Sequence, residues 1–345
     1  MLRPLSLSFL FFIPFILTAQ FSGPESVEYD PNGDRYFVSN TQSSSIKVLD
    51  QQGQVTDFVT DMPDAPYGLE IMGEVLYAAM GTGVRGYSLI SGEEVYSRNV
   101  NALFPNGITT DGTYLYVTDF QGNRIFKIDP VADTHPTLLN STGGTPNGIV
   151  YDPAEERLVV VFWGSNAPIK QVDPETGAVE HLVLASGLTN IDGITIDCHG
   201  YFITSSWSPN RITRWEPSFT SPGVNMSVTG LGAPADLDLD HMNGRICIPN
   251  SSLNTVVLHE VDCSTGIPPM HQEEIQVIPN PVRDLVHVQP AFKKREPYLI
   301  LDARGLMIGG GTLNPNAMLD LGQLKPGTYV LDFTSARRQV RFIKE

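Results

Sequence analysis

The chain has 345 residues, 41% of them hydrophobic, so it can bury a normal globular core in one large domain plus a small one. It carries 22 Lys and Arg against 38 Asp and Glu, a formal net charge of −16 at pH 7. The negative charge lies in the first 271 residues, which hold 12 basic and 30 acidic side chains. Phosphate binding needs Lys and Arg, so this balance argues against a nucleic-acid partner and favours neutral or cationic ligands.

The first residues have the pattern of a secretory signal. Arg3 precedes an apolar run from Leu5 to Leu17, and Ala19 offers a small residue for cleavage. A membrane anchor is the weaker interpretation, because Pro14 interrupts the run and no later apolar segment follows. We predict a signal peptide over residues 1–19, an exported protein, and no transmembrane segment in the mature chain.

A sequence motif that predicts two short strands joined by a tight turn then occurs six times. The copies begin at Glu25, Tyr67, Asn106, Asn147, Asp192 and Ala235, with offsets of 42, 39, 41, 45 and 43 residues. Each copy has room for four short strands, which is typical of a blade of a β-propeller. A β-sandwich would not explain the common period, and Gly and Pro punctuate the chain too often for helices. We predict an all-β chain with a six-bladed β-propeller over residues 20–262.

Two features of the predicted propeller stay open. The outer strand of the sixth blade is not obvious, and Gln20–Ser22 could supply it. Cys247 could pair with Cys263 in an oxidising compartment, but the third cysteine, Cys198, leaves at least one free thiol. The spacing of the cysteines matches no zinc site.

Residues 263–274 break every pattern and are predicted to be a linker. Residues 275–345 show alternating strands and tight turns, which predict a small C-terminal β-sandwich. This segment resembles the C-terminal sorting domain of the type IX secretion system of Bacteroidetes. The motifs that carry the resemblance are Pro279-Asn280-Pro281, Asp302 with Gly305, Leu321 to Leu324, Pro326-Gly327-Thr328-Tyr329, and the basic residues Arg337, Arg338, Arg341 and Lys344. The resemblance implies export by that machinery, to the medium or the cell surface. The plainer interpretation is an ordinary spacer or carbohydrate-binding sandwich.

Equivalent positions at the starts of the six inner strands should form a ring around the channel. The six positions hold Glu25, Tyr67, Asn106, Asn147, Asp192 and Ala235, so four of them are oxygen donors. Oxygen-only donors suit a hard cation, Ca²⁺ above Mg²⁺, and disfavour zinc. We therefore predict a calcium site at Glu25, Asn106, Asn147 and Asp192, with another divalent cation as the alternative. Asn-Gly and Asp-Gly are also common turn formers, so any one of these residues could have a purely structural role.

A second ring is expected where the second strand of each blade ends. Bulky aromatic residues cluster there over the third to fifth blades, beside the predicted metal, as in a mostly apolar substrate pocket. The predicted pocket residues are Tyr67, Asp119, Phe120, Trp163, Trp207 and Asn250.

The propeller region, roughly residues 21–262, resembles the family of senescence marker protein 30, gluconolactonases and luciferin-regenerating enzymes, with diisopropyl-fluorophosphatase and paraoxonase as more distant relatives. The motifs are Pro24-Glu25-Ser26-Val27 with Asp30, Pro105-Asn106-Gly107-Ile108, Pro146-Asn147-Gly148-Ile149, and Asp192-Gly193-Ile194 with Ser206-Trp207. The family places a Glu, two Asn and an Asp on the channel metal, which correspond here to the four predicted ligands. The resemblance implies a metal-dependent hydrolase of lactones or esters, in which Asp192 activates water or attacks directly.

The sequence departs from the family in its charged residues. Neither ring contains Lys, Arg or His, so recognition of an anionic sugar acid and a paraoxonase-like histidine pair are not supported. The leading prediction is an exported calcium-dependent lactonase or esterase that acts on a small molecule. The alternative is a non-catalytic propeller of the NHL type that binds a ligand or a surface partner. A propeller like strictosidine synthase, which lacks the metal, is disfavoured by the four donors.

Overall fold

The computed structural model describes residues 20–263, 275–289, 292, 295–302, 306–315, 318–333 and 338–345. The predicted signal peptide, the predicted linker after Cys263, and Gly305 and Arg337 of the sorting-domain motifs lie outside these residues. The described chain is all-β, as predicted from the sequence. In the described ranges, no helix has the length and apolar character needed to cross a membrane.

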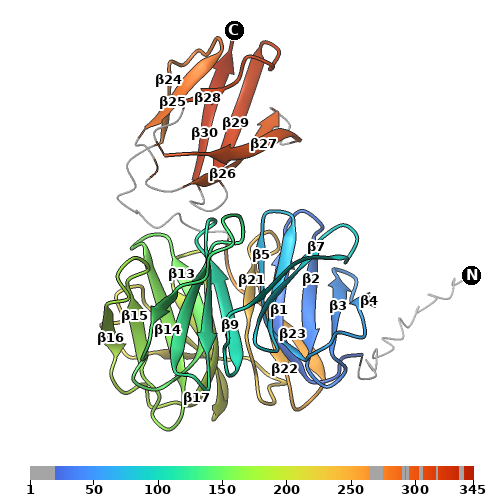
Figure 1. Cartoon of the computed structure of the whole chain (residues 1–345), viewed down its shortest axis with the longest axis vertical. Helices are drawn as coiled ribbons and strands as arrows, with labels where there is room; N and C mark the ends of the chain where they lie inside the picture. The colour runs from blue at the N-terminus through green and yellow to red at the C-terminus, as the bar shows by residue number, and fades with distance from the viewer. Residues whose placement is uncertain are drawn as a thin grey trace, which may run out of the picture.

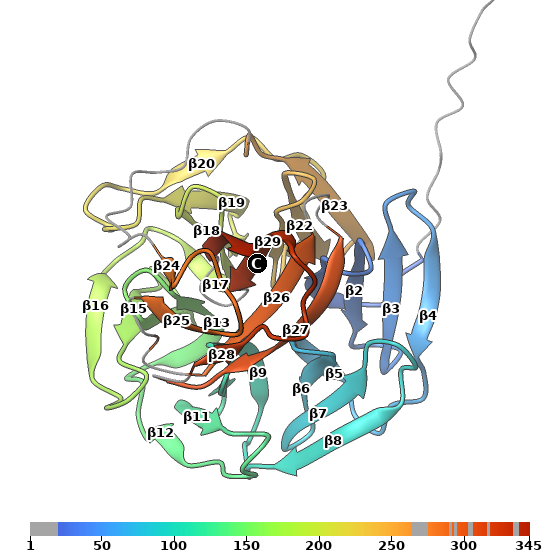
Figure 2. The same ribbon diagram turned by 90° about the horizontal axis from the view of Figure 1, so that it is seen from above.

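Six antiparallel sheets surround a central axis and form the propeller (Figure 2). Each sheet is built from consecutive strands, ordered from the axis outward. The first three blades are β1 (Pro24–Asp30), β2 (Arg35–Asn40), β3 (Ser45–Asp50), β4 (Val55–Val59); β5 (Pro66–Met72), β6 (Val75–Met80), β7 (Gly83–Ser88), β8 (Glu94–Asn99); and β9 (Pro105–Thr110), β10 (Leu115–Asp119), β11 (Arg124–Ile128), β12 (Thr137–Leu139). The other three are β13 (Thr145–Asp152), β14 (Arg157–Trp163), β15 (Ile169–Val172), β16 (Val179–Val183); β17 (Thr189–Ile196), β18 (Phe202–Ser208), β19 (Asn210–Trp215), β20 (Val224–Met226); and β21 (Asp238–Asp240), β22 (Arg245–Asn250), β23 (Thr255–Glu260).

The core of the propeller lies between neighbouring blades. Ile149, Val160, Ile194 and Phe202, from the fourth and fifth blades, belong to one buried cluster. Successive side chains of a strand point to opposite faces of its sheet, and each face packs against a neighbouring blade. Apolar residues are therefore buried on both faces of each sheet.

Glycines allow the inner strands to approach one another closely around the axis. A Cβ atom on Gly107 would lie 2.4 Å from the backbone oxygen of Asn147, and one on Gly68 would lie 2.4 Å from that of Asn106. Glycine is therefore required at these two positions, because a side chain would push neighbouring blades apart. The residue before each glycine is fixed at the start of its strand, facing the mouth of the channel.

Hydrogen bonds between the first and sixth blades close the ring. The amide of Asp236 donates to the oxygen of Glu25 (2.8 Å), and the amide of Val27 donates to the oxygen of Asp236 (3.2 Å). The sixth blade has three strands within the described residues, and Gln20–Ser22 do not add a fourth. Instead, the amide of Ser22 donates to Oδ1 of Asn40 in the first blade (2.8 Å). The suggestion that Gln20–Ser22 complete the sixth blade is therefore wrong.

The disulfide joins Cys198 to Cys263 and leaves Cys247 free and buried. The suggested pairing of Cys247 with Cys263 is thus wrong. Cys247 is 0% exposed on β22 and packs in the cluster between the first and sixth blades, where it has no disulfide partner. Cys198 lies in the turn between β17 and β18, so the bond ties the end of the propeller to its fifth blade.

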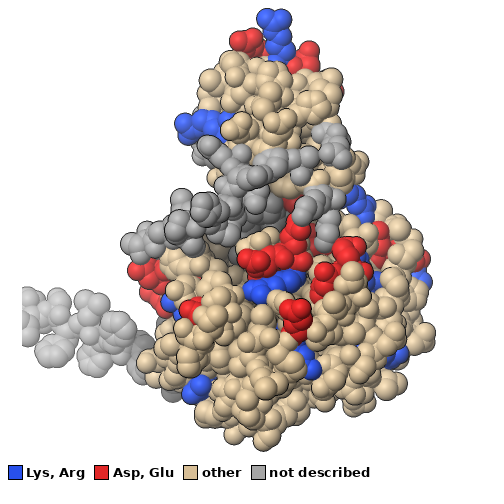
Figure 3. All heavy atoms as spheres, turned by 90° about the vertical axis from the view of Figure 1, so that its left-hand side faces the viewer, with Lys and Arg blue, Asp and Glu red and all other residues tan. Residues whose placement is uncertain are grey.

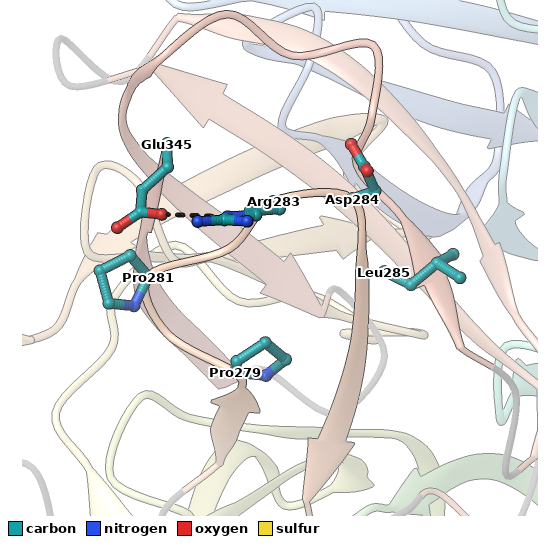
Figure 4. A pocket seen from close by; sticks show the side chains of 6 residues that line it. All are labelled: Pro279, Pro281, Arg283, Asp284, Leu285 and Glu345. Carbon is teal, nitrogen blue, oxygen red and sulfur yellow. Dashed lines mark hydrogen bonds and ion pairs between the residues drawn. The ribbon is translucent and has the colours of Figure 1, made fainter.

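The C-terminal unit has two sheets. One has the order β24 (Gln276–Ile278), β25 (Leu285–Gln289), β28 (Leu319–Asp320), and the other has the order β27 (Met307–Leu313), β26 (Glu296–Asp302), β29 (Gly327–Phe333), β30 (Arg338–Lys344). Val277 and Val286 from the first sheet share one core cluster with Phe333 and Phe342 from the second, which is the packing of a sandwich. An open hollow of about 430 Å³ lies at one end of this unit and is lined by Pro279, Pro281, Arg283, Asp284, Leu285 and Glu345 (Figure 4).

The C-terminal unit lies over one mouth of the propeller (Figures 1 and 2). Arg295 forms an ion pair with Asp129 of the third blade at 3.3 Å, and its backbone oxygen accepts from Oγ1 of Thr113 at 3.3 Å. Figure 3 shows acidic and basic side chains gathered on one face of the propeller below the C-terminal unit. Thr113 lies in the turn after β9, whereas Asn106 lies at the start of that strand, so this mouth is opposite the one that carries the predicted calcium ligands.

Candidate functional site

The four predicted ligands lie at the starts of four inner strands, β1, β9, β13 and β17. Their side chains are buried, with exposed fractions of 8% for Glu25, 7% for Asn106, 2% for Asn147 and 3% for Asp192. Three of them form a hydrogen-bonded chain: Nδ2 of Asn106 donates to Oδ1 of Asn147 (2.6 Å), and Nδ2 of Asn147 donates to Oδ1 of Asp192 (3.1 Å). Residues about 40 positions apart in the sequence therefore meet at one mouth of the channel.

Glu25 faces the same mouth with an unsatisfied oxygen. Its Oε2 is buried and has no hydrogen-bond partner. Burial raises the pKa of Glu25 well above its usual value, and the nearby carboxylates of Asp192 and Asp236 raise it further. Burial also raises the pKa of Asp192 to about 7, although Trp207 and Asn147 partly offset this rise. An uncompensated buried carboxylate is costly, so the pair needs protons or a cation.

The residues present fit a hard cation. The donors are two carboxylates and two amides, and the unpaired Oε2 of Glu25 is available for coordination. Within the described part of the chain, no three His, Cys, Asp or Glu side chains are placed to hold a metal ion by themselves. A cation at this mouth would therefore depend on the amide oxygens of Asn106 and Asn147 as well as on the two carboxylates.

Asp236 is a nearby acid that the sequence analysis missed. It occupies the position of the sixth blade where the second to fifth blades have glycine, next to Ala235 of the first ring. It accepts a hydrogen bond from Oγ of Ser26 (3.1 Å), and burial followed by the charge of Asp192 raises its pKa well above the usual value. The signal that could have revealed it is a carboxylate at a position where four of the other five blades have glycine.

Further acidic side chains lie on the inner strands beyond this site, where they accept hydrogen bonds from backbone amides. Oε1 of Glu28 accepts from the amide of Ile71 (3.0 Å), and Oδ2 of Asp238 accepts from the amide of Tyr29 (3.0 Å). Burial, followed by the charges of neighbouring acids, raises the pKa of Glu28 well above its usual value. These bonds link neighbouring inner strands, so the layer has a structural role.

Five aromatic rings form a continuous arc above the candidate ligands. The distances between successive ring centroids are 4.6 Å for Tyr67 and Phe104, 5.3 Å for Phe104 and Phe120, 5.9 Å for Phe120 and Trp163, and 4.9 Å for Trp163 and Trp207. All five rings are half-buried, and their edge-to-face or tilted arrangement is the favoured geometry for aromatic pairs. Tyr67, Phe120, Trp163 and Trp207 thus lie together. Phe104 was not among the predicted pocket residues because it precedes the repeated Pro-Asn-Gly motif.

Asp119 and Asn250 do not line this mouth, which corrects their assignment to the substrate pocket. Both are 0% exposed. Asp119 accepts from the amides of Leu103 and Phe104 and pairs with Arg124 at 2.7 Å. Asn250 accepts from the amide of Gly232 at 2.9 Å. Each side chain satisfies the backbone of the loop that precedes its blade's inner strand, so their part in the site is to position that loop.

Comparisons with known proteins identify the fold. No protein-family model matches the chain, and a search of curated proteins found no significant match. Among solved structures, the chain is similar to XC5397, a gluconolactonase from Xanthomonas campestris, with a TM-score of 0.56 and 14% identity over 67% of this chain and 84% of that one. It is also similar to a chain of a nidogen/laminin complex, with a TM-score of 0.53 and 19% identity over 65% of this chain and 92% of that one. A streptogramin B lyase gives a TM-score of 0.51 and 18% identity over 70% of this chain and 84% of that one. At these identities the likeness concerns the fold alone.

Proposed function

We propose that this protein is an exported calcium-dependent hydrolase of lactone or ester bonds. The observation that supports it best is the meeting of four buried oxygen donors from four blades, with Oε2 of Glu25 unpaired, beneath an arc of aromatic rings. The fold likeness to a gluconolactonase is compatible with this proposal.

Glu25, Asn106, Asn147 and Asp192 would hold the Ca²⁺ ion, although Mg²⁺ or another divalent cation also fits oxygen donors. When bound, the ion would supply Lewis-acid polarisation of the substrate carbonyl. The protein's own contribution is to hold the donors in place: the hydrogen-bonded chain through Asn147 fixes both amides and Asp192 relative to one another. Burial by neighbouring blades keeps bulk water away, which strengthens every charge interaction at this mouth.

Asp192 is the proposed catalytic residue. As a general base it takes a proton from a water molecule while the water oxygen bonds to the carbonyl carbon. The ester C–O bond then breaks, and the proton passes from Asp192 to the departing oxygen, so the products are an acid and an alcohol. If Asp192 attacks as a nucleophile instead, its own oxygen bonds to the carbonyl carbon, the ester C–O bond breaks, and the departing alkoxide takes a proton from a water molecule. The hydroxide that remains then attacks the Asp192 carboxyl carbon of the mixed anhydride, which releases the acid and restores the Asp192 carboxyl group. A single turnover in ¹⁸O-water distinguishes the two routes, since only the second places ¹⁸O in the Asp192 carboxyl group.

The chain ends support the proposed location. A signal peptide over residues 1–19 would direct export, and the C-terminal unit would act as a sorting domain for the type IX secretion machinery. Removal of residues 275–345 should then leave the propeller inside the cell that makes it, and a full-length protein that is equally retained would contradict this role.

Calorimetric titration with calcium tests the proposal. Wild type should bind one ion per chain, and Glu25→Gln and Asp192→Asn should each weaken binding at least tenfold. Asp64→Asn, which changes an exposed acid beside Gly81 at the same mouth, should bind as wild type does. Wild type should also hydrolyse members of a panel of neutral lactones and esters, and a chelator should abolish this activity. Absence of divalent-metal binding by wild type would overturn the proposal.

A non-catalytic binding propeller is the second candidate. It is favoured by the fold likeness to a chain from a nidogen/laminin complex, and the aromatic arc would then be its binding surface. Calcium binding without turnover of any panel member would favour this second function.

A further inference from the structure

The rings of the aromatic arc have no cation of their own, in contrast to other half-buried rings of the propeller. Nζ of Lys127 lies 4.2 Å from the ring centroid of Tyr114, and the guanidinium group of Arg214 lies 3.8 Å from that of Tyr201. Among the described residues, no Lys or Arg side chain lies over any of the five rings of the arc. Because aromatic faces attract cations, these rings are available to a cation from solution.

The charge around the arc also favours a cation. Neither ring of the channel mouth contains Lys, Arg or His, and the first 271 residues hold 12 basic and 30 acidic side chains. Burial, followed by the charge of Glu25, raises the pKa of Tyr67, so this carboxyl group acts on the first ring of the arc. An acidic mouth without basic side chains in its rings attracts positively charged ligands and repels anions.

Tyr67 and Phe104 form a corner that suits an ammonium group. Their ring centroids are 4.6 Å apart and their planes differ by 72°. A cation is attracted to a ring within about 6 Å of its centroid, so one quaternary ammonium group can contact both rings. Both rings are half-buried, so part of each is open to solvent. Tyr67 lies at the start of β5, which packs between the inner strands of Glu25 and Asn106, so the corner is beside the proposed metal ligands.

We propose that the corner of Tyr67 and Phe104 binds an organic cation, and that the preferred substrate is an ester or lactone with a quaternary ammonium group near its carbonyl. The inference rests on the proposed hydrolase function and adds a substrate class to it. The two rings hold the ammonium group, which keeps the ester bond near Asp192. The carboxylates of Glu25 and Asp192 balance the charge of the proposed Ca²⁺ ion, so the ion does not cancel the attraction.

Acetylcholine and 3,3-dimethylbutyl acetate test the charge preference, because these esters have nearly the same shape and differ by one positive charge. In saturating calcium at low ionic strength, wild type should hydrolyse acetylcholine with a kcat/KM at least about tenfold higher than that for the neutral ester. Added salt should lower this ratio, because it screens the attraction. A wild type that hydrolyses both esters equally well overturns this inference and leaves the proposed function standing.

Ring substitutions test the position of the cation. Tyr67→Leu and Phe104→Leu each remove one ring and should lower the ratio of the two kcat/KM values toward one. Tyr67→Phe keeps the ring and should keep most of the ratio. Tyr114→Leu is the matched control, since Tyr114 lies at the opposite mouth, and it should keep the wild-type ratio. A ratio that survives both substitutions at the corner overturns the assignment of the site.

A binding measurement separates failure of this inference from failure of the proposed function. In calorimetry with calcium present, wild type should bind choline at least about tenfold more tightly than its neutral analogue 3,3-dimethylbutan-1-ol. Tyr67→Leu should bind choline several-fold more weakly than wild type. An active wild type that binds choline no better than the neutral alcohol overturns the cation site alone. Choline binding without hydrolysis of either ester overturns the proposed function and supports the cation site.

Discussion

Replacing Asp192 by Asn should stabilise the metal-free protein more at pH 8, by about 4 kcal/mol, than at pH 4.5, by about 1 kcal/mol. Burial raises the pKa of Asp192 from 3.8 to about 7. Above pH 3.8 the unfolded chain loses this proton while the folded chain keeps it, so stability falls as the pH rises toward 7. The loss is complete once the pH exceeds the folded pKa, and asparagine carries no such cost.

The size of the effect follows from the pKa shift. A rise of about 3 units corresponds to about 4 kcal/mol at pH 8, since one unit is about 1.4 kcal/mol. At pH 4.5, which is less than one unit above the ordinary value, the cost is about 1 kcal/mol. The difference of about 3 kcal/mol corresponds to about 6–12 °C in Tm for a domain of this size.

Thermal unfolding of wild type and Asp192→Asn at both pH values, in the presence of a chelator, measures this difference. The difference in Tm between the two proteins at each pH cancels the contribution of all other titrating groups. Asp64→Asn serves as the exposed-acid control. Calcium at about 100 times its Kd should restore about 3 kcal/mol to wild type at pH 8 and much less to the variant. Equal Tm differences between wild type and Asp192→Asn at pH 4.5 and pH 8 would refute the reasoning.

Three further predictions concern the scaffold. Gly107→Ala should cost at least about 1–3 kcal/mol in denaturant unfolding, because its Cβ would meet a backbone oxygen at 2.4 Å, whereas Gly309→Ala, whose nearest contact is 3.8 Å, should be tolerated. Cys198→Ser should cost about 4 kcal/mol through loss of a disulfide with a sequence separation of 65, and non-reducing peptide mapping should find Cys247 alkylated only after unfolding. Asp119→Asn should lower Tm by weakening a buried ion pair and loop hydrogen bonds, yet leave calcium affinity within about threefold of wild type; a large loss of affinity would show a direct role at the site.

The propeller could be predicted from the sequence because the sequence repeat is long and regular, and most copies share a recognisable motif. The equivalence of Asn106 and Asn147 followed from that period, and their side chains do meet through a hydrogen bond. The period also placed Trp163 and Trp207 at equivalent positions, where their rings are in contact.

What the repeat could not predict depends on contacts outside its equivalent positions. The repeat places Asp119 next to the residues predicted to line the pocket. Its side chain instead accepts hydrogen bonds from loop amides, and the repeat pattern does not show which way a side chain points. The partner of Cys263 depends on where the chain leaves the propeller, which brings it to the β17–β18 turn. Phe104 lies outside the repeated motif, so its place in the arc became evident only from the ring contacts.

The Cys198–Cys263 bond has a mechanical consequence. The last propeller strand, β23, is the outer edge of a three-stranded blade and pairs with β22 along one edge. A pull on the chain beyond Cys263, such as traction on the C-terminal unit during passage through a pore, would otherwise peel this strand away first. The covalent link directs that load into the turn of the fifth blade instead. A force applied to the C-terminal segment would therefore not separate β23 from its sheet before the disulfide takes the load.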